Sequence, residues 1–195
     1  MSNSLKRQRG NALVEGALSL PLLIGAALLI GDLYNINLAR AHLEQSAHGI
    51  ASTLAMQNRL DQDGLQALID QVAAPDILGD YELLISKVNL DRSMTWRPLR
   101  RGNLEGLCAE NSEGERYTGE LPEEIERTAA ESEETAASSA SILVVQLCRN
   151  SDNLALSNGL LLDKDMQAIA FGRMVYSEVA LDRLLSEEVG VDYQD

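Results

Sequence analysis

The stretch RGNALVEGALSLPLLIGAALLIGDL, residues 9–33, decides how this chain is organised. It carries no charged side chain between residues 16 and 31, a run that spans roughly 24 Å as an α-helix. A bilayer core of roughly 30 Å needs a few more residues, and the segment 12–15 supplies them. This extension places Glu15 within the apolar span, where an unpaired carboxylate costs several kcal/mol. The sequence therefore predicts a transmembrane helix over residues 11–31 with a functional carboxylate near its start.

Charge is distributed unevenly around this span. Residues 1–10 contain three basic side chains and no acidic one, whereas the whole chain of 195 residues has a net charge of −14. Basic residues beside a membrane span stay in the cytoplasm, so the acidic part after the span is expected to be translocated. Such an acidic chain is a poor match for the phosphate backbone, and no nucleic-acid partner is expected.

Three interpretations of the apolar segment remain open from the residues alone. The first is a secretory signal peptide that is cleaved near residues 38–41. The second is a signal anchor that is not cleaved, which would make the chain an envelope binding protein. The third depends on the residues that precede the apolar run.

The junction RGNALVE, residues 9–15, resembles the leader of type IV prepilins. In that family a short basic leader ends in Gly, a prepilin peptidase cuts after this Gly, and the fifth mature residue is Glu. The corresponding residues here are Gly10, Asn11 as the first mature residue, and Glu15. The chain start is most similar to TadE/TadF-like minor pseudopilins of the tight-adherence (Tad/Flp) pilus, at Gly10, Ala12, Val14, Glu15, Leu20 and Pro21.

This resemblance implies a non-enzymatic role in assembling a tight-adherence pilus, hence in adherence and biofilm formation. It implies a single-pass protein of the bacterial inner membrane, with a cytoplasmic N-terminus and a periplasmic domain. Incorporation into the pilus is the alternative location. The implied partners are the prepilin peptidase, other pilins and pseudopilins, and the assembly machinery. Glu15 is expected to pair with the N-terminal ammonium of a neighbouring subunit, which would offset the cost of a buried charge.

Two further features refine these expectations. Pro21 removes one helix hydrogen bond and is expected to kink the span. Between the two branches of the family, the pair of cysteines after the span slightly favours the TadF-like branch.

Beyond the membrane span, the sequence predicts an amphipathic extension over residues 32–60. Apolar residues recur at spacings of three and four, which places them on one helical face. We expect this face to pack against the protein's own globular part. The residues are Ile36, Ala39, Leu43, Ala47, Ile50 and Leu54.

Residues 61–195 are expected to form a small α+β domain with antiparallel strands. Asp63 is expected to cap a short helix that ends before Pro75. Strands are predicted at residues 81–90, 95–98, 141–148 and 166–176, and a last helix at 181–189. Pro98 indicates an edge position for the second strand. The Glu-rich segment 110–141 is expected to be a flexible acidic loop.

Cys108 and Cys148 flank this acidic segment. If the domain lies outside the cytoplasm, the two cysteines are expected to form a disulfide. The sequence offers no metal-ligand spacing and no cofactor fingerprint, so neither a metal nor a cofactor is expected. The two histidines, His42 and His48, lie six residues apart on the predicted helix and form no nucleophile–base pattern. A secreted enzyme is therefore the more distant alternative.

Overall fold

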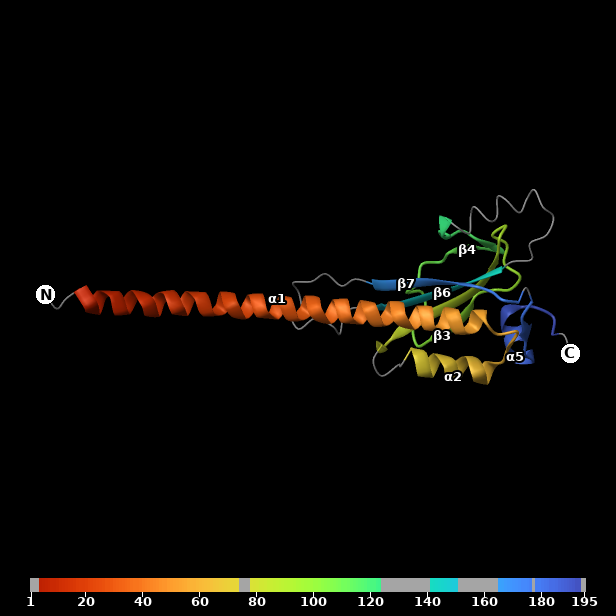
Figure 1. The fold of residues 1–195 in the computed structure, drawn as a ribbon, viewed down its shortest axis with the longest axis horizontal. Helices are drawn as coiled ribbons and strands as arrows, with labels where there is room; N and C mark the ends of the chain where they lie inside the picture. Colours follow the sequence, from red (N-terminus) through yellow and green to blue (C-terminus); the bar gives the residue numbers. More distant parts are fainter. Residues whose placement is uncertain (1–3, 74–77, 124–140, 151–164, 177, 194–195) are drawn as a thin grey trace. The chain divides into compact units, whose positions relative to one another are not determined.

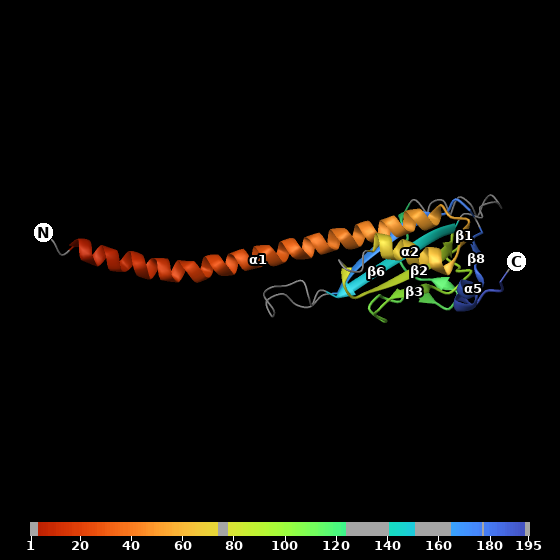
Figure 2. The same ribbon diagram turned by 90° about the horizontal axis from the view of Figure 1, so that it is seen from below.

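The chain divides into two units, which are described separately. One unit contains residues 1–38 and 151–164, and the other contains residues 39–150 and 165–195. The computed structural model describes residues 4–73, 78–123, 141–150, 165–176 and 178–193, and it describes side chains from residue 14 onward. The ribbon is drawn in Figures 1 and 2.

The described part of the first unit is helical. It belongs to α1, which runs without interruption from Ser4 to Ala55 and includes Pro21. The portion from Val14 onward is long and apolar enough to cross a membrane, as judged by length and composition. These two properties are shared by membrane anchors and by signal sequences near an N-terminus.

The second unit is organised around a four-stranded antiparallel sheet in the order β3-β2-β6-β7. The strands are β2 (Tyr81–Asn89), β3 (Leu99–Gly102), β6 (Ser141–Asn150) and β7 (Asp165–Arg173). The central pair β2 and β6 is matched over nine residue pairs, from Tyr81 opposite Arg149 to Asn89 opposite Ser141. Eight consecutive residues of β2 and nine of β6 are buried, so the two central strands are covered on both faces.

Helices cover one face of this sheet. The last part of α1 lies beside α2 (Gln62–Val72), as Figures 1 and 2 show, and Ser46 Oγ donates a hydrogen bond of 3.0 Å to the carbonyl oxygen of Val72. The third helix on this side is α5 (Arg183–Val189). The resulting core combines helix residues with alternate strand residues, among them Leu43, Ile50, Leu65, Ile69, Leu83, Ile85, Val145, Leu147 and Leu185.

The opposite face is covered by the segment that follows β2. This segment contains a short hairpin of β4 (Ser112–Glu113) and β5 (Arg116–Tyr117). A second apolar cluster forms beneath it from Val88, Met94, Tyr117, Leu121, Ile142 and Val144. Because strand side chains alternate between faces, Val88 and Val144 point away from the residues that meet the helices.

A pair of short parallel strands joins the segment after α1 to the segment before α5. β1 (Arg59–Leu60) pairs with β8 (Ala180–Leu181). Beside this pair, the Asp182 carboxylate accepts hydrogen bonds from the backbone N–H groups of Gln62, at 2.7 Å, and Leu185, at 2.8 Å. One carboxylate thus helps to start two helices that are far apart in sequence.

These observations confirm an α+β arrangement with a long N-terminal helix and antiparallel strands. Expected strands at 81–90, 141–148 and 166–176 correspond to β2, β6 and β7, and the expected helix 181–189 corresponds to α5. Three local predictions differ from the structure in the residues concerned. The strand expected at residues 95–98 instead begins after Pro98, although β3 does lie at an edge of the sheet.

The other two corrections concern the helices. The predicted extension 32–60 ends at Ala55, because the chain then turns and enters β1. The N-cap of α2 is Asp61 and not Asp63, since the Asp61 side chain accepts a hydrogen bond from the N–H of Gly64. Within the expected loop 110–141, residues 112–117 form the β4–β5 hairpin, while residues 124–140 lie outside the described part.

The crossing of α1 over β7 depends on Gly172. A Cβ atom at this position would lie 2.7 Å from the carbonyl oxygen of Ala51 and 2.9 Å from the Cβ atom of Ala55. We expect Gly172→Val to lower the free energy of unfolding by about 1–3 kcal/mol, as overpacking does. Thermal or denaturant unfolding of the full chain in detergent, followed by Trp96 fluorescence, measures this change. Gln167→Val, at an exposed position of the same strand, is the control; equal stability of both variants would contradict the prediction.

Candidate functional site

The residues expected to act at the N-terminus all lie in α1. Gly10 and Asn11 are consecutive helical residues, and Glu15 lies four residues after Asn11. Residues at this spacing share one face of a helix, about one turn apart. The Glu15 side chain is exposed. Pro21 lies inside the helix, six residues further along.

The apolar side chains that follow Glu15 are also exposed. Leu22 reaches 76% exposure and Leu18 reaches 68%. No residue in the most apolar 18-residue stretch of this span is buried within the protein. A helix with an apolar surface on all sides is stable only in contact with lipid or with other apolar helices. The exposed large side chains of this segment are Val14, Leu18, Leu20, Leu22, Leu23, Ile24, Leu28, Leu29 and Ile30.

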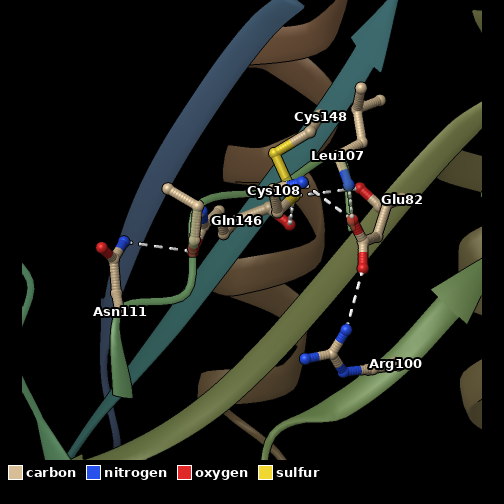
Figure 3. Close-up of a disulfide and its surroundings, with 8 residues drawn as sticks. Glu82, Arg100, Leu107, Cys108, Asn111, Gln146 and Cys148 are labelled. Atoms are coloured by element: carbon tan, nitrogen blue, oxygen red, sulfur yellow. Dashed lines mark hydrogen bonds and ion pairs between the residues drawn. A yellow bond between two sulfur atoms is a disulfide. The ribbon is translucent and has the colours of Figure 1, made fainter. Parts of the chain in front are cut away.

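A second cluster of interest surrounds the disulfide in the globular unit. Cys108 and Cys148 are bonded, with Cα atoms 5.4 Å apart, so the expected pairing is present. Cys148 belongs to β6, and Cys108 belongs to the segment that covers the face of the sheet away from the helices. Figure 3 shows the disulfide that joins this segment to β6, with Glu82 of β2 and Gln146 of β6 nearby.

Glu82 of β2 binds the backbone of the same segment next to the disulfide. Its Oε2 atom accepts hydrogen bonds from the N–H groups of Leu107, at 2.6 Å, and Cys108, at 2.7 Å. Its Oε1 atom lies 3.2 Å from Nη1 of Arg100, and the same guanidinium contacts Glu110 at 3.1 Å. Only 1% of Glu82 is exposed, so this carboxylate replaces its water contacts with protein donors.

The environment of Glu82 favours its charged form. Burial raises the pKa of Glu82, but backbone donors from Cys108, Gly106 and Leu107, together with Arg100, lower this pKa below its ordinary value. Hydrogen bonds from several N–H groups commonly stabilise a buried carboxylate in this way. Glu82 is therefore an anion that fixes the backbone around Cys108.

Gln146 makes the equivalent connection from β6. Its Nε2 atom donates to the carbonyl oxygen of Ala109 at 2.9 Å, and its Oε1 atom accepts from Asn111 Nδ2 at 3.3 Å. Residues 107–111 are thus attached to the sheet by one covalent bond and two polar side chains (Figure 3). The role of these contacts is structural, because Glu82 and Gln146 both bind backbone groups of the segment and fix it against the sheet.

Sequence reasoning identified the two cysteines but missed Glu82, Arg100 and Gln146. A signal was present, since Glu82 and Gln146 are polar residues within strands that the sequence predicts to be largely apolar. A buried polar residue requires a hydrogen-bond partner. The identity of that partner, 25 and 37 residues away, is a consequence of the tertiary fold.

Among the residues that the structure describes, no three His, Cys, Asp or Glu side chains are grouped in a way that could hold a metal ion. His42 and His48 lie on α1 and both are exposed, as expected for solvated residues.

Comparison with protein-family models, with curated proteins and with solved structures finds no match to this chain.

We expect removal of the disulfide to destabilise the globular unit. Loss of a cross-link between residues 40 apart costs about 4 kcal/mol in the chain-entropy model. A Cys108→Ala, Cys148→Ala double variant should unfold at a lower temperature than the oxidised chain. Added reductant should lower the unfolding temperature of the original chain and leave that of the double variant unchanged. No response of the original chain to reductant would contradict a stabilising cross-link.

We also expect Glu82 to make stability depend on pH. Because folding lowers its pKa from the ordinary value of 4.5, its stabilising effect is complete above that pH and is lost as pH falls through the folded pKa. Glu82→Gln should cost about 2–4 kcal/mol at pH 7 and should flatten the acid side of the stability curve. Denaturant unfolding between pH 3 and 8 gives this curve.

The control is Glu110→Gln, because Glu110 contacts the same Arg100 but is exposed. This exposed pair contributes little to stability. If the Glu110 variant is as unstable as the Glu82 variant, the charges around Arg100 determine the loss of stability, and the backbone contacts of Glu82 do not.

Proposed function

We propose that this chain is a minor pseudopilin that supports assembly of a tight-adherence-type pilus. A prepilin peptidase removes residues 1–10, and the mature chain, beginning at Asn11, stays anchored in the bacterial inner membrane by residues 11–31. The globular unit faces the periplasm. The partners are the peptidase, other pilins and pseudopilins, and the assembly machinery.

The observation that carries the proposal is the junction from Gly10 to Glu15 at the start of an exposed apolar helix. A basic leader, a Gly, and a Glu five residues later stand directly before the apolar segment of α1. The exposure of that segment agrees with a surface that lipid or neighbouring helices cover. The arrangement supports both an anchor in the membrane and contact with other subunits.

Two further observations agree with the proposed topology. The three basic residues of the leader favour a cytoplasmic N-terminus, because positive residues are retained on that side. The disulfide favours an oxidising compartment for the globular unit. The two features lie on opposite sides of the apolar segment in sequence, and they support the same orientation.

We propose no catalytic role. Among the described residues, Glu82 accepts a hydrogen bond from the backbone N–H of Leu107 and Gln146 donates one to the carbonyl oxygen of Ala109, contacts that suit a structural role. Between the two family branches, the disulfide-bonded domain is the feature that supports the TadF-like branch.

The first expected outcome concerns processing. Protein extracted from the membranes of its native cells should begin at Asn11, as measured by intact mass and N-terminal sequencing, and Gly10→Val should prevent this cleavage. A chain that begins at Met1 or Ser2 would indicate a signal-anchored envelope protein unrelated to pili. A soluble chain that begins after Ala41 would indicate a cleaved signal peptide and would renew the case for a secreted enzyme.

The second expected outcome concerns assembly. Glu15→Val should abolish piliation while the protein remains in the membrane fraction, because the carboxylate that would pair with a neighbouring N-terminal ammonium is lost. Glu44→Val is the matched control, since Glu44 is an exposed residue of the same helix that pairs with Arg40. Normal piliation in the Glu15 variant would contradict the proposed role of this residue.

A further inference from the structure

The disulfide of the globular unit is shielded from solvent at both ends. Only 5% of Cys108 and 1% of Cys148 are exposed. Cys148 belongs to β6, and Cys108 belongs to residues 104–111, which we call the covering segment. A thiol that reduces a disulfide must reach one of its sulfur atoms. While the covering segment lies against the sheet, neither cysteine presents a surface for this attack.

Two polar side chains of the sheet hold the covering segment in addition to the disulfide (Figure 3). Glu82 Oε2 accepts hydrogen bonds from the N–H groups of Leu107, at 2.6 Å, and Cys108, at 2.7 Å. Gln146 Nε2 donates to the carbonyl oxygen of Ala109 at 2.9 Å. These three hydrogen bonds keep the backbone on both sides of Cys108 against β2 and β6.

The apolar contacts beneath the covering segment are separate from the main core. Leu84 and Leu107 pack with the two cysteines, whereas Ile85 belongs to the core on the helix side. The ion pair of Arg100 with Glu110 is exposed and adds little. A unit with few buried apolar contacts opens at a lower free energy than the whole domain unfolds. The covering segment is therefore able to leave the sheet while the helices stay packed.

We propose that the covering segment is a gate over its own disulfide, and that Glu82 and Gln146 hold this gate closed. When it opens, a thiolate of an external dithiol attacks one sulfur atom, the S–S bond breaks, and the released cysteine thiolate takes up a proton. The second thiol of the reagent, as its thiolate, then displaces the other cysteine thiolate, which is also protonated. Two electrons have passed to the protein, and the dithiol has become a cyclic disulfide.

The closed gate preserves the oxidised state of the globular unit in the presence of other thiols. The charge of Glu82 acts in the same direction, because an anion beside Cys108 repels an incoming thiolate. The inference is independent of the proposed role in pilus assembly, since the residues involved all belong to the globular unit.

The test measures how fast dithiothreitol reduces the full chain in detergent without denaturant. Free thiols are alkylated at successive times and counted by intact mass, and the chain has only the two cysteines of this disulfide. We expect the folded chain to be reduced at least about a hundred-fold more slowly than the same chain in urea, because a closed site reacts only through its open fraction.

Variants of the two polar side chains test what holds the gate. Glu82→Gln and Gln146→Leu should each speed reduction at least about five-fold, since each weakens hydrogen bonds to the covering segment. Gln146→Leu keeps the carboxylate of Glu82, so it separates opening of the gate from repulsion of the thiolate. Glu105→Gln is the matched control, because Glu105 is an exposed residue of the same segment, and it should leave the rate unchanged.

Gly172→Val distinguishes opening of the gate from unfolding of the whole unit. This variant strains the contact of β7 with α1, on the face of the sheet away from the covering segment. It should lower the unfolding temperature and leave the rate of reduction unchanged, because local opening does not require the helix side to unfold.

Three results would overturn the proposal. One is reduction of the folded chain as fast as that of the chain in urea. Another is an unchanged rate in folded Glu82 and Gln146 variants. The last is a Gly172 variant whose reduction is accelerated as much as that of the Glu82 variant, since reduction would then follow global unfolding. The first and last comparisons leave the covering segment intact, and the first needs no variant, so a variant that does not fold leaves the test decisive.

Discussion

The central strand pair β2–β6 imposes the main constraint on the globular unit. Both strands are buried on both faces over almost their whole length, so the chain must supply two separate covers. Helices α1, α2 and α5 form one cover through apolar contacts. The other cover is a segment with little regular structure, and it is held by the disulfide and by hydrogen bonds from Glu82 and Gln146. Glu82, a charged residue within a buried strand, thus fixes the backbone of this segment against the sheet. Burying its charge is the energetic cost of this contact.

Local patterns made much of this arrangement predictable, whereas contacts between distant segments did not. The apolar, β-branched run at residues 141–148 identified β6, and the spacing of Leu43, Ala47 and Ile50 identified the buried face of α1. The capping residue of α2 was missed, because Asp61 and Asp63 are both plausible caps from sequence. The role of Asp182, which accepts hydrogen bonds at the starts of two helices, depends on a contact across 120 residues. The residues of the N-terminal junction were identified from sequence alone, and their role is still a proposal.

The helix α1 satisfies different physical requirements along its length. Residues 39–55 bury one face, and there Ala51 and Ala55 lie close to Gly172 of β7. Residues 14–30 present apolar side chains on every side, and this composition is costly in water. A single helix therefore combines a stripe suited to a protein core with a surface suited to lipid or to a bundle of similar helices. This division supports the proposal that the apolar part acts in the membrane or between subunits.

Under the proposed function, processing and assembly are coupled through one charge. Glu15 lies one helical turn from Asn11, and the amino group proposed to neutralise a neighbour's Glu15 exists only after cleavage before Asn11. An uncleaved chain still carries the basic leader, which favours the cytoplasmic surface and holds the start of the helix there. Removal of the leader both releases this restraint and creates the ammonium group that offsets the buried carboxylate. The peptidase step would then select the chains that are able to assemble, without any change in the globular unit.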